Sequence, residues 1–445
     1  MTNLPPALRG TQARILATTD LGANAVPLPT SYGTSGTLAG IVELLDRERE
    51  RQPTLWLDVG DLVVGNPSHP LLGERPWADV ADLPIAAAAA GNHEFDDGVD
   101  ALLEDTRRLS FPLLCANVDV GLPPSSLLET AAGPVGVIGL TSPNSHRYSR
   151  APAPAADWPD RVQALAGELR GDGARWVVAL LHDGVEWWPA NPVATRSSRL
   201  QDVARPWAAA VDLILGGHNF AAWTGALAGT PAGEPHVFGA SVVVVDMADR
   251  AVVRGVYRAP ARPPRGSSPA VEAIERARSQ LVGETPHHWL TRTAARHYLP
   301  QLLADGLRSA TGADAALVVP SFHGTQAPLD GAIGSLGPGP VTELDAARLF
   351  GSPDYDPVIA ELRPGELRAA VQAHWATADP ANRDGDRVWW NWCRMPAAAS
   401  TGAGDPASVA MIPGVTRHLS LLLDRDVQAE PAATSARDAL VAAVA

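Results

Sequence analysis

The sequence predicts an α/β protein of two domains, and three observations support this. The chain has 445 residues, whereas an ordinary domain has about 100–200. In the first half, short apolar runs alternate with segments of helical spacing, as in folds built on parallel strands. Arg258 to Ser268 is rich in Pro, Arg, Gly and Ser, which is typical of a linker. We expect a first domain at 10–258, a linker and bridging helix at 259–284, and a second domain at 285–445.

Composition limits the classes of partner. Hydrophobic residues make up 46% of the chain and charged residues 19%, which is typical of a globular protein. The net charge of −14 argues against a nucleic-acid polymer or an anionic membrane as the main partner. Two cysteines, Cys115 and Cys393, are too few for a disulfide framework. With no apolar run of about 18 residues, we expect a cytoplasmic protein.

The first unit of the chain is expected to be strand, helix, strand. Arg14 to Thr19 is an apolar strand that ends at Asp20, and Thr37 to Arg51 has helical spacing. Further strands also end at polar or glycine residues: Thr54–Leu57 before Asp58-Val59-Gly60-Asp61, Ala86–Ala90 before Gly91, Phe111–Ala116 before Asn117, Gly136–Leu140 before Thr141, Trp176–Leu181 before His182 and Val211–Leu215 before Gly216. Ligands of layered α/β folds gather at the carboxyl ends of strands, so a site is expected there.

The rest of the chain has its own order of elements. Two strands, Ser241–Val245 and Val252–Tyr257, are expected to complete the first domain. After the linker we expect a helix at Pro269–Val282, a helix at Tyr298–Thr311, a strand at Ala315–Val319, a loop at Pro320–Pro340, a strand and a helix within Pro357–Trp375, and a strand at Leu419–Leu423.

The most informative motif is Gly91-Asn92-His93-Glu94-Phe95-Asp96-Asp97-Gly98. Asn92 offers an amide oxygen for a hard metal, His93 can carry a proton, and Asp96 can orient that histidine. Metal-assisted hydrolysis needs these three groups together. An ordinary polar turn would also be rich in Gly, Asn and Asp. The functional interpretation of this motif therefore depends on the polar residues that follow the other predicted strands.

Taken together, Asp20, Asp58-Val59-Gly60-Asp61, Gly91-Asn92-His93-Glu94, His182-Asp183-Gly184 and Gly217-His218 resemble the calcineurin-like metallophosphoesterases. The branch of 5′-nucleotidases and 2′,3′-cyclic-nucleotide phosphodiesterases is the most similar. The resemblance implies a four-layer α/β/β/α sandwich followed by a smaller α/β substrate domain. It also implies a metal-dependent phosphatase or phosphoesterase, in which a metal-bound hydroxide attacks phosphorus.

The resemblance assigns a role to each motif residue. Asp61 would bridge two metal ions, and Asp20 would bind the first. The second ion would be completed by Asn92, His182 and His218. His93 would be the general acid, oriented by Asp96, while Asp58 would support its loop. The implied cofactor is a divalent transition metal (Mn, Fe, Zn or Co), one or two ions per chain, and the implied partner is a small phosphorylated substrate.

Two departures affect the first metal. The family's first strand ends Asp-x-His, but this chain has Gly22 at the third position, and the family's Gly-His-x-His is here Gly217-His218-Asn219-Phe220. Three interpretations stay open. A single ion could serve a hydrolase, Asn219 or His323 could supply ligands for the first ion, or the pocket could bind a ligand without hydrolysis. A metalloenzyme of another reaction class, reusing the second metal's ligands, is a further alternative.

Substrate contacts are harder to predict. Relatives carry an arginine in a turn after the strand of the second domain, but here Val319 is followed by Pro320-Ser321-Phe322-His323. Phe322 could stack on a planar group and His323 could bind a phosphate, while a buried Phe with a solvent-facing His is the plain alternative. Asn219 and His146 are further candidates because each follows a strand end. We expect a nucleotide-like compound or another phosphorylated metabolite, and the oligomeric state is not predicted.

Overall fold

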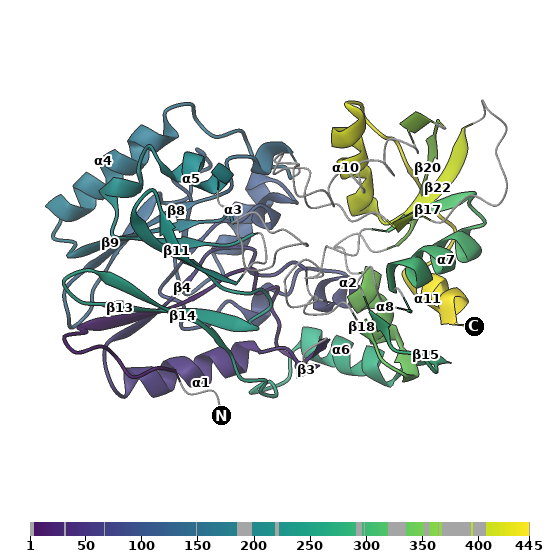
Figure 1. Ribbon diagram of the computed structural model, residues 1–445, viewed down its shortest axis with the longest axis horizontal. Coiled ribbons are helices and arrows are strands. Elements are labelled where there is room, and N and C mark those ends of the chain that lie inside the picture. Colours follow the sequence, from purple (N-terminus) through teal and green to yellow (C-terminus); the bar gives the residue numbers. More distant parts are fainter. Residues whose placement is uncertain are drawn as a thin grey trace.

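The structure is a computed structural model that describes residues 4–30, 33–65, 67–147, 149–184, 198–218, 222–290, 296–297, 299–318, 335–350, 356–363, 365–366, 393–394 and 406–444. The chain forms two lobes (Figure 1). The first contains two six-stranded sheets, and the second contains a five-stranded sheet. The exact domain boundaries remain a prediction.

The first sheet has the order β14-β13-β1-β4-β5-β6. Its strands are β1 (Ala13–Thr18), β4 (Thr54–Asp58), β5 (Ala87–Ala89), β6 (Leu113–Leu114), β13 (Ser241–Met247) and β14 (Ala251–Arg258). β1, β4, β5 and β6 are parallel, and β13 is antiparallel to β1. The ends of β1, β4 and β5 therefore point to one edge of the sheet.

The second sheet has the order β11-β12-β10-β9-β8-β7. Its strands are β7 (Ser125–Leu128), β8 (Val135–Leu140), β9 (Trp176–Leu181), β10 (Leu213–Gly216), β11 (Trp223–Leu227) and β12 (Thr230–Glu234). β8, β9, β10 and β12 are parallel, while β7 and β11 are antiparallel edge strands. The sequence predicted the central strands β8, β9 and β10 and did not predict β7, β11 and β12.

The two sheets stack face to face because their strands are apolar on both sides. In β1, Ile15 joins the cluster between the sheets, whereas Leu16 packs outward against Ile41 of α1 (Leu38–Arg49). In β9, Val178 faces the first sheet and Val177 packs outward. The outer layers are α1 and α3 (Val99–Thr106) on one side, and α4 (Trp158–Gly171) and α5 (Ser198–Ala204) on the other. The predicted α/β/β/α sandwich is confirmed.

Helix α6 (Pro269–Ser279) follows the predicted linker. The Ser268 hydroxyl accepts a hydrogen bond from the amide of Val271 (3.2 Å), and Pro269 occupies the first turn, so the sequence fixes the start of the helix. α6 contacts α2 (Ser68–Leu72) of the first lobe and α8 (Glu343–Phe350) of the second. It therefore lies at the junction of the two lobes (Figure 1).

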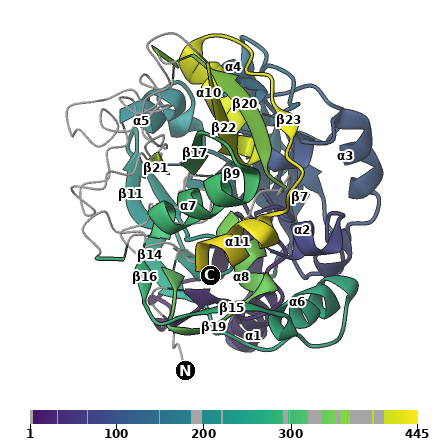
Figure 2. The same cartoon turned by 90° about the vertical axis from the view of Figure 1, so that its right-hand side faces the viewer.

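The second lobe is built on the sheet β21-β17-β22-β20-β23. Its strands are β17 (Ala315–Val318), β20 (Val358–Leu362), β21 (Cys393–Arg394), β22 (Ala407–Met411) and β23 (Glu430–Pro431), and its helices include α7 (Leu299–Thr311), α10 (Pro413–Leu423) and α11 (Ala436–Val444). α7 and α11 pack side by side (Figure 2). Within the described ranges, no helix combines the length and the apolar character needed to cross a membrane.

Two expectations for this lobe are wrong. The predicted strand Leu419–Leu423 is the last part of α10, because Val415 and Leu419 lie one turn apart and both are buried. The predicted loop Pro320–Pro340 contains β18 (Ser335–Leu336) and the start of β19 (Gly339–Thr342), which pair with β16 (Trp289–Leu290) and β15 (Leu281–Thr285). The helix expected after β20 lies largely outside the described residues. A short hairpin, β2 (Pro29–Thr30) with β3 (Gly33–Thr34), was not predicted.

Candidate metal centre

The loops after β4, β9 and β10 bring three metal-binding side chains together. Asp61, His182 and His218 each place a ligand atom within 4.8 Å of the others. The Oδ2 atom of Asp61 is 3.1 Å from Nε2 of His182, and the Oδ1 atom of Asn92 is 3.2 Å from the same nitrogen. In the part of the chain that the structure describes, this is the one such group of His, Cys, Asp and Glu side chains.

The chemistry of this group fits a cation. Nδ1 of His182 lies 2.9 Å from the carbonyl oxygen of Val59, and since a carbonyl can only accept, that nitrogen carries the hydrogen. With an ion present, a neutral His182 would turn its Nε2 lone pair to the same point as the oxygens of Asp61 and Asn92. Three acceptors that face a common point are held together by a positive ion, and metal-binding histidines commonly bond a backbone carbonyl through their other nitrogen. The residues therefore fit a divalent transition metal.

The electrostatics of the site favour a positive charge at this point. Burial opposes ionisation of Asp61, yet the charges of His182 and His93 hold the pKa of its carboxyl below the usual range. Burial also opposes the charge on His182, but Asp61 and Asp20 raise its pKa to about 10. Each group is thus stabilised in its charged form by the other. Because metal binding requires a neutral imidazole, an ion would replace the proton of His182 as the partner of Asp61.

The ligands are held by a strained backbone. Asp61 and His218 adopt the left-handed conformation with φ of 56° and 71°, which costs about 1–3 kcal/mol for a residue other than glycine. Gly91 allows the close approach of the Asp61 carboxylate, because a Cβ atom at this position would lie 2.1 Å from Oδ1 of Asp61. Strain of this kind persists where the surroundings impose it, and it is concentrated at functional sites.

His93 and Asp96 form the predicted pair. Nδ1 of His93 lies 2.6 Å from Oδ2 of Asp96, and the His93 amide donates to Oδ1 of Asp61 (2.9 Å). The His93 side chain is 26% exposed, compared with 4% for Asp61, so its ring lies at the solvent side of the metal group. Burial lowers the pKa of His93, but the charges of Asp96 and Asp61 outweigh it and raise that pKa to about 9. His93 is therefore suited to donate a proton.

Asp20 and Asp58 both bond to nearby groups of the protein. Oδ2 of Asp20 accepts hydrogen bonds from the Thr19 hydroxyl (2.6 Å) and the His218 amide (2.9 Å). Burial raises the pKa of Asp20 to about 7. Asp58 accepts from the Thr18 hydroxyl (2.6 Å) and the Gly60 amide (2.8 Å), which is the loop-supporting arrangement expected for it.

Two residues near the site were not singled out from the sequence. Glu94 is 1% exposed, and its carboxylate accepts hydrogen bonds from the amides of Asp61 (2.9 Å), Leu62 (2.8 Å) and Gly91 (2.6 Å). Arg75 donates to the carbonyl of His93 (2.9 Å) and pairs with Asp97 (2.8 Å). Glu94 lies inside the quoted motif but its bonds to the Asp61 loop depend on the fold, and nothing in the sequence marks Arg75.

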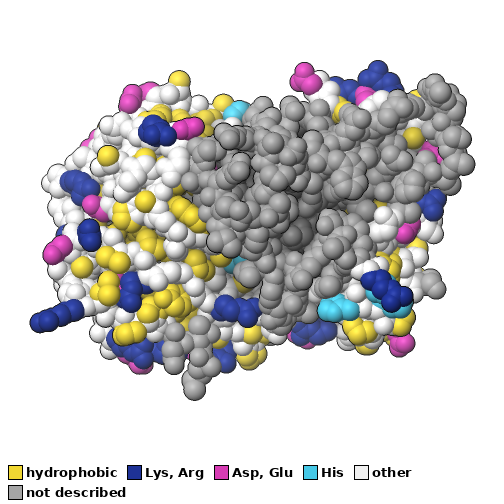
Figure 3. All heavy atoms as spheres, in the orientation of Figure 1, with side chains coloured by type: hydrophobic (Ala, Val, Ile, Leu, Met, Phe, Trp, Pro, Cys, Tyr) yellow, Lys and Arg dark blue, Asp and Glu magenta, His cyan; other side chains and the backbone are white. Residues whose placement is uncertain are grey.

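The predicted substrate residues are only partly visible. His146 is exposed in a short 3₁₀ helix, Ser145–Arg147, beyond the end of β8. It is not among the side chains that converge on the metal group. Asn219, Phe322 and His323 lie outside the described residues. On the face shown in Figure 3, basic and acidic side chains are mixed over the described surface of the first lobe.

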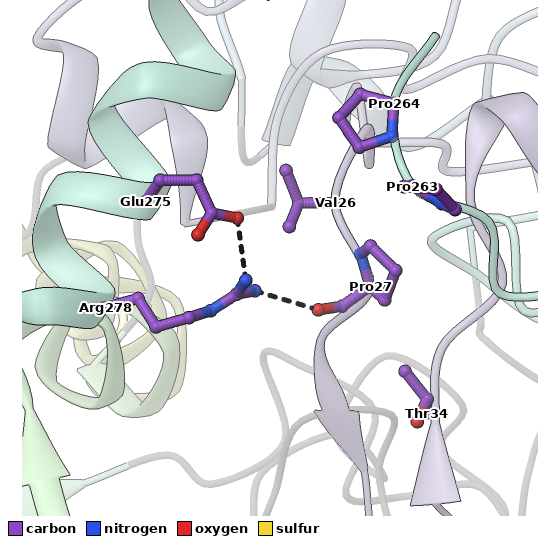
Figure 4. A pocket seen from close by; sticks show the side chains of 7 residues that line it. All are labelled: Val26, Pro27, Thr34, Pro263, Pro264, Glu275 and Arg278. Carbon is purple, nitrogen blue, oxygen red and sulfur yellow. Dashed lines mark hydrogen bonds and ion pairs between the residues drawn. The ribbon is translucent and has the colours of Figure 1, made fainter.

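A separate cavity of about 520 Å³ lies beside the second half of α6. Arg278 donates to Glu275 (2.7 Å) and to the carbonyl of Pro27 (3.0 Å) at its wall (Figure 4). Its other lining residues are Val26, Thr34, Pro263 and Pro264. The cavity contains none of the motif residues, and its two charged side chains pair with each other, so we do not assign the chemistry to it.

Comparisons with known proteins relate this chain to one family. Residues 13–220 match the calcineurin-like phosphoesterase family. A 5′-nucleotidase of Diplobatis ommata is 33% identical over 192 residues, which cover 40% of this chain and 29% of that protein. A 2′,3′-cyclic-nucleotide 2′-phosphodiesterase/3′-nucleotidase of Salmonella typhimurium is 26% identical over 281 residues, or 53% of this chain and 43% of that protein. The chain thus spans less than half the length of either curated relative.

The fold comparison extends over both lobes. The crystal structure of a 5′-nucleotidase precursor from Thermus thermophilus has a TM-score of 0.73 to this chain at 19% identity, and the match covers 97% of this chain and 96% of that one. At this identity the likeness concerns the fold alone. The family match and the sequence similarity show that this chain contains a calcineurin-like phosphoesterase domain at residues 13–220 and is homologous to 5′-nucleotidases.

Proposed function

We propose that this protein is a metal-dependent hydrolase of phosphate esters. The observation that carries the proposal is the convergence of Asp61, Asn92, His182 and His218, with the His93–Asp96 pair beside them. These four side chains would hold the metal. When bound, a divalent ion polarises a phosphoryl oxygen and lowers the pKa of water, which is the chemistry that such a hydrolysis needs.

His93 is proposed to act on the leaving group. Because Nδ1 bonds to Asp96, Nε2 is the nitrogen that would deliver a proton to the departing oxygen. Asp96 fixes the ring orientation and stabilises the protonated imidazole. The hydrogen bond from the His93 amide to Asp61 ties the proton donor to a metal ligand, so the two parts of the site keep a constant spacing.

The substrate is proposed to be a small phosphorylated molecule, either nucleotide-like or another phosphorylated metabolite. The names of the curated relatives support a nucleotide. The absence of an arginine in the segment Val319 to Gln326 supports a different phosphate ester. A cytoplasmic location, expected from the sequence, stays part of the proposal.

The test compares esters whose leaving groups differ in basicity. Purified protein is loaded with Mn²⁺ and assayed on p-nitrophenyl phosphate, bis-p-nitrophenyl phosphate, 5′-AMP, 3′-AMP and 2′,3′-cyclic AMP. General acid catalysis contributes about 10²–10⁴-fold in rate. We expect His93→Asn to lose roughly that factor on the nucleotides and much less on the p-nitrophenyl esters, because p-nitrophenolate leaves without a proton.

The matched control is His288→Asn, which changes an exposed histidine outside the site. It should leave every rate unchanged. If wild-type protein with bound Mn²⁺ hydrolyses none of the esters, a non-hydrolytic scaffold is the better description. If His93→Asn slows all of them equally, His93 has a role other than protonating the leaving group.

A further inference from the structure

The surroundings of Asp61 differ on its two sides: metal-binding side chains lie on the side that faces His182, and the side that faces Asp20 has different neighbours. Two-metal phosphoesterases place two ions about 3.5–4 Å apart with a shared carboxylate, so a second ion beside Asp61 needs its own ligands. The chain at Asp20 runs along the Asp61 loop, where the Asp20 amide donates to the Gly60 carbonyl (2.8 Å) and the Gly22 amide to the Asp61 carbonyl (3.3 Å). Position 22 is thus adjacent to Asp61, and glycine offers no ligand there.

The space beside Gly22 is filled by a phenyl ring. A Cβ atom built on Gly22 would lie 3.0 Å from Cδ1 and Cε1 of Phe238 and 2.9 Å from the carbonyl oxygen of Val64. The same ring lies against Gly65, where an added Cβ would be 3.1 Å from Cε1. A longer side chain at position 22 would collide with these atoms, so a ligand has no room at this position.

Phe238 is fixed in this place by its backbone. Its amide donates to the Asp20 carbonyl (2.8 Å), and its own carbonyl accepts from the Asn24 side chain (2.8 Å). The residue is 2% exposed and adopts φ of 53°, the left-handed region that costs a phenylalanine free energy. An apolar ring held so firmly offers neither charge nor hydrogen-bonding atoms to a hydrated divalent ion.

Asp20 has a different task in this arrangement. One of its oxygens accepts hydrogen bonds from the Thr19 hydroxyl and the His218 amide. The second bond fixes the backbone of His218 in its left-handed conformation, and this backbone aims the imidazole at Asp61 and His182. Asp20 therefore acts as a positioning residue for a metal ligand.

We infer that this protein binds one metal ion, held by Asp61, Asn92, His182 and His218. Phe238, packed on Gly22, occupies the space that a second metal ion and its ligand would need. The inference rests on the proposed function and sharpens it to a mononuclear hydrolase. Asn219 and His323 lie outside the described residues, and the number of bound ions tests whether they supply further ligands.

The experiment counts ions and examines their coupling. Chelated, full-length protein is dialysed against increasing Mn²⁺, bound metal is measured by elemental analysis, and electron paramagnetic resonance is recorded at each step. We expect saturation at one Mn²⁺ per chain with the six-line spectrum of an isolated ion. Two Mn²⁺ per chain with an exchange-coupled spectrum would overturn the inference.

Two variants separate the roles of the residues. His218→Ala removes a ligand and should abolish binding at Mn²⁺ concentrations that saturate the wild type. Asp20→Ala should keep a stoichiometry of one and weaken that binding about 10–100-fold, the usual effect of losing a partner of a metal ligand. A fall from two ions to one in Asp20→Ala would instead show that Asp20 holds an ion of its own.

The outcomes also distinguish this inference from the proposed function. Two ions per chain with phosphate-ester hydrolysis would leave the proposed function standing and refute the single-ion site. No bound ion in the wild type would refute both. One ion with hydrolysis would support both.

Discussion

Glu94 is expected to be a main structural support of the metal centre, and its substitution is the most informative test of the loop architecture. Its carboxylate accepts three backbone hydrogen bonds: Oε2 takes the amides of Asp61 and Gly91, and Oε1 takes the amide of Leu62. These bonds join the loop after β4, which carries Asp61, to the loop after β5, which carries Asn92. Both loops therefore depend on one side chain.

The loss of stability expected for a substitution of Glu94 follows from the number of these hydrogen bonds. Glu94→Gln keeps the volume but replaces one acceptor oxygen by a donor, so at least one amide loses its partner. A hydrogen bond to a charged group contributes about 1.5–3 kcal/mol. Burial and the nearby charge of Asp61 raise the pKa of Glu94, so removing the charge also relieves some repulsion. We expect a net loss of about 2 kcal/mol for Glu94→Gln. Glu94→Ala leaves three buried donors without partners and should cost about 3–6 kcal/mol.

The assay is urea unfolding followed by tryptophan fluorescence, together with Mn²⁺ affinity by dialysis. Glu94→Gln should lower the unfolding free energy and weaken Mn²⁺ binding about 10–100-fold, because the Asp61 loop is no longer held. Glu104→Gln, on the exposed surface of α3, is the matched control and should change neither quantity. Unfolding and metal affinity equal to those of the wild type in Glu94→Gln would refute this account of the loops.

Three further predictions concern other buried groups. Arg75→Met removes the hydrogen bond to the His93 carbonyl and should lower kcat about tenfold while the Mn²⁺ stoichiometry is unchanged, measured by steady-state kinetics and dialysis. Asp96→Asn removes a charge that raises the pKa of His93, so the alkaline limb of the kcat profile should move to lower pH by about 1–2 units; a shift to higher pH would contradict this. Burial lowers the pKa of His236 to about 4 from 6.5, and neither ring nitrogen has a hydrogen-bond partner among the described residues. The neutral His236 side chain therefore contributes fully to the free energy of unfolding above pH 6.5. This contribution is lost as the pH falls towards 4, by up to about 3 kcal/mol. His236→Leu should therefore flatten the dependence of unfolding free energy on pH in this range, and an unchanged slope would contradict the prediction.

The sequence was sufficient for most of the site because the chemistry lies at strand ends. Each of Asp61, Asn92, His182 and His218 follows a short apolar run, and parallel strands bring such positions to one edge. The failures have a different origin. An apolar run such as Leu419–Leu423 has no strong period, so its helical state depends on the buried turn-to-turn contacts of Val415 and Leu419. Likewise the role of Glu94 depends on amides of another loop.

The first metal position shows most clearly what sequence reasoning lacks. Gly22 and Phe220 reveal from the sequence that two imidazoles are absent. An absent ligand is compatible with an empty space, with a substitute ligand, or with an apolar side chain that fills the space. The filling of this space by Phe238 follows from the fold. Because β13 runs antiparallel to β1, the loop before β13 lies next to the loop after β1. Phe238 then meets Gly22 through a contact between segments far apart in the chain. Since the lost histidine and the inserted ring occupy neighbouring space, replacing Gly22 alone would not rebuild a second site, and the two positions must be considered as one change.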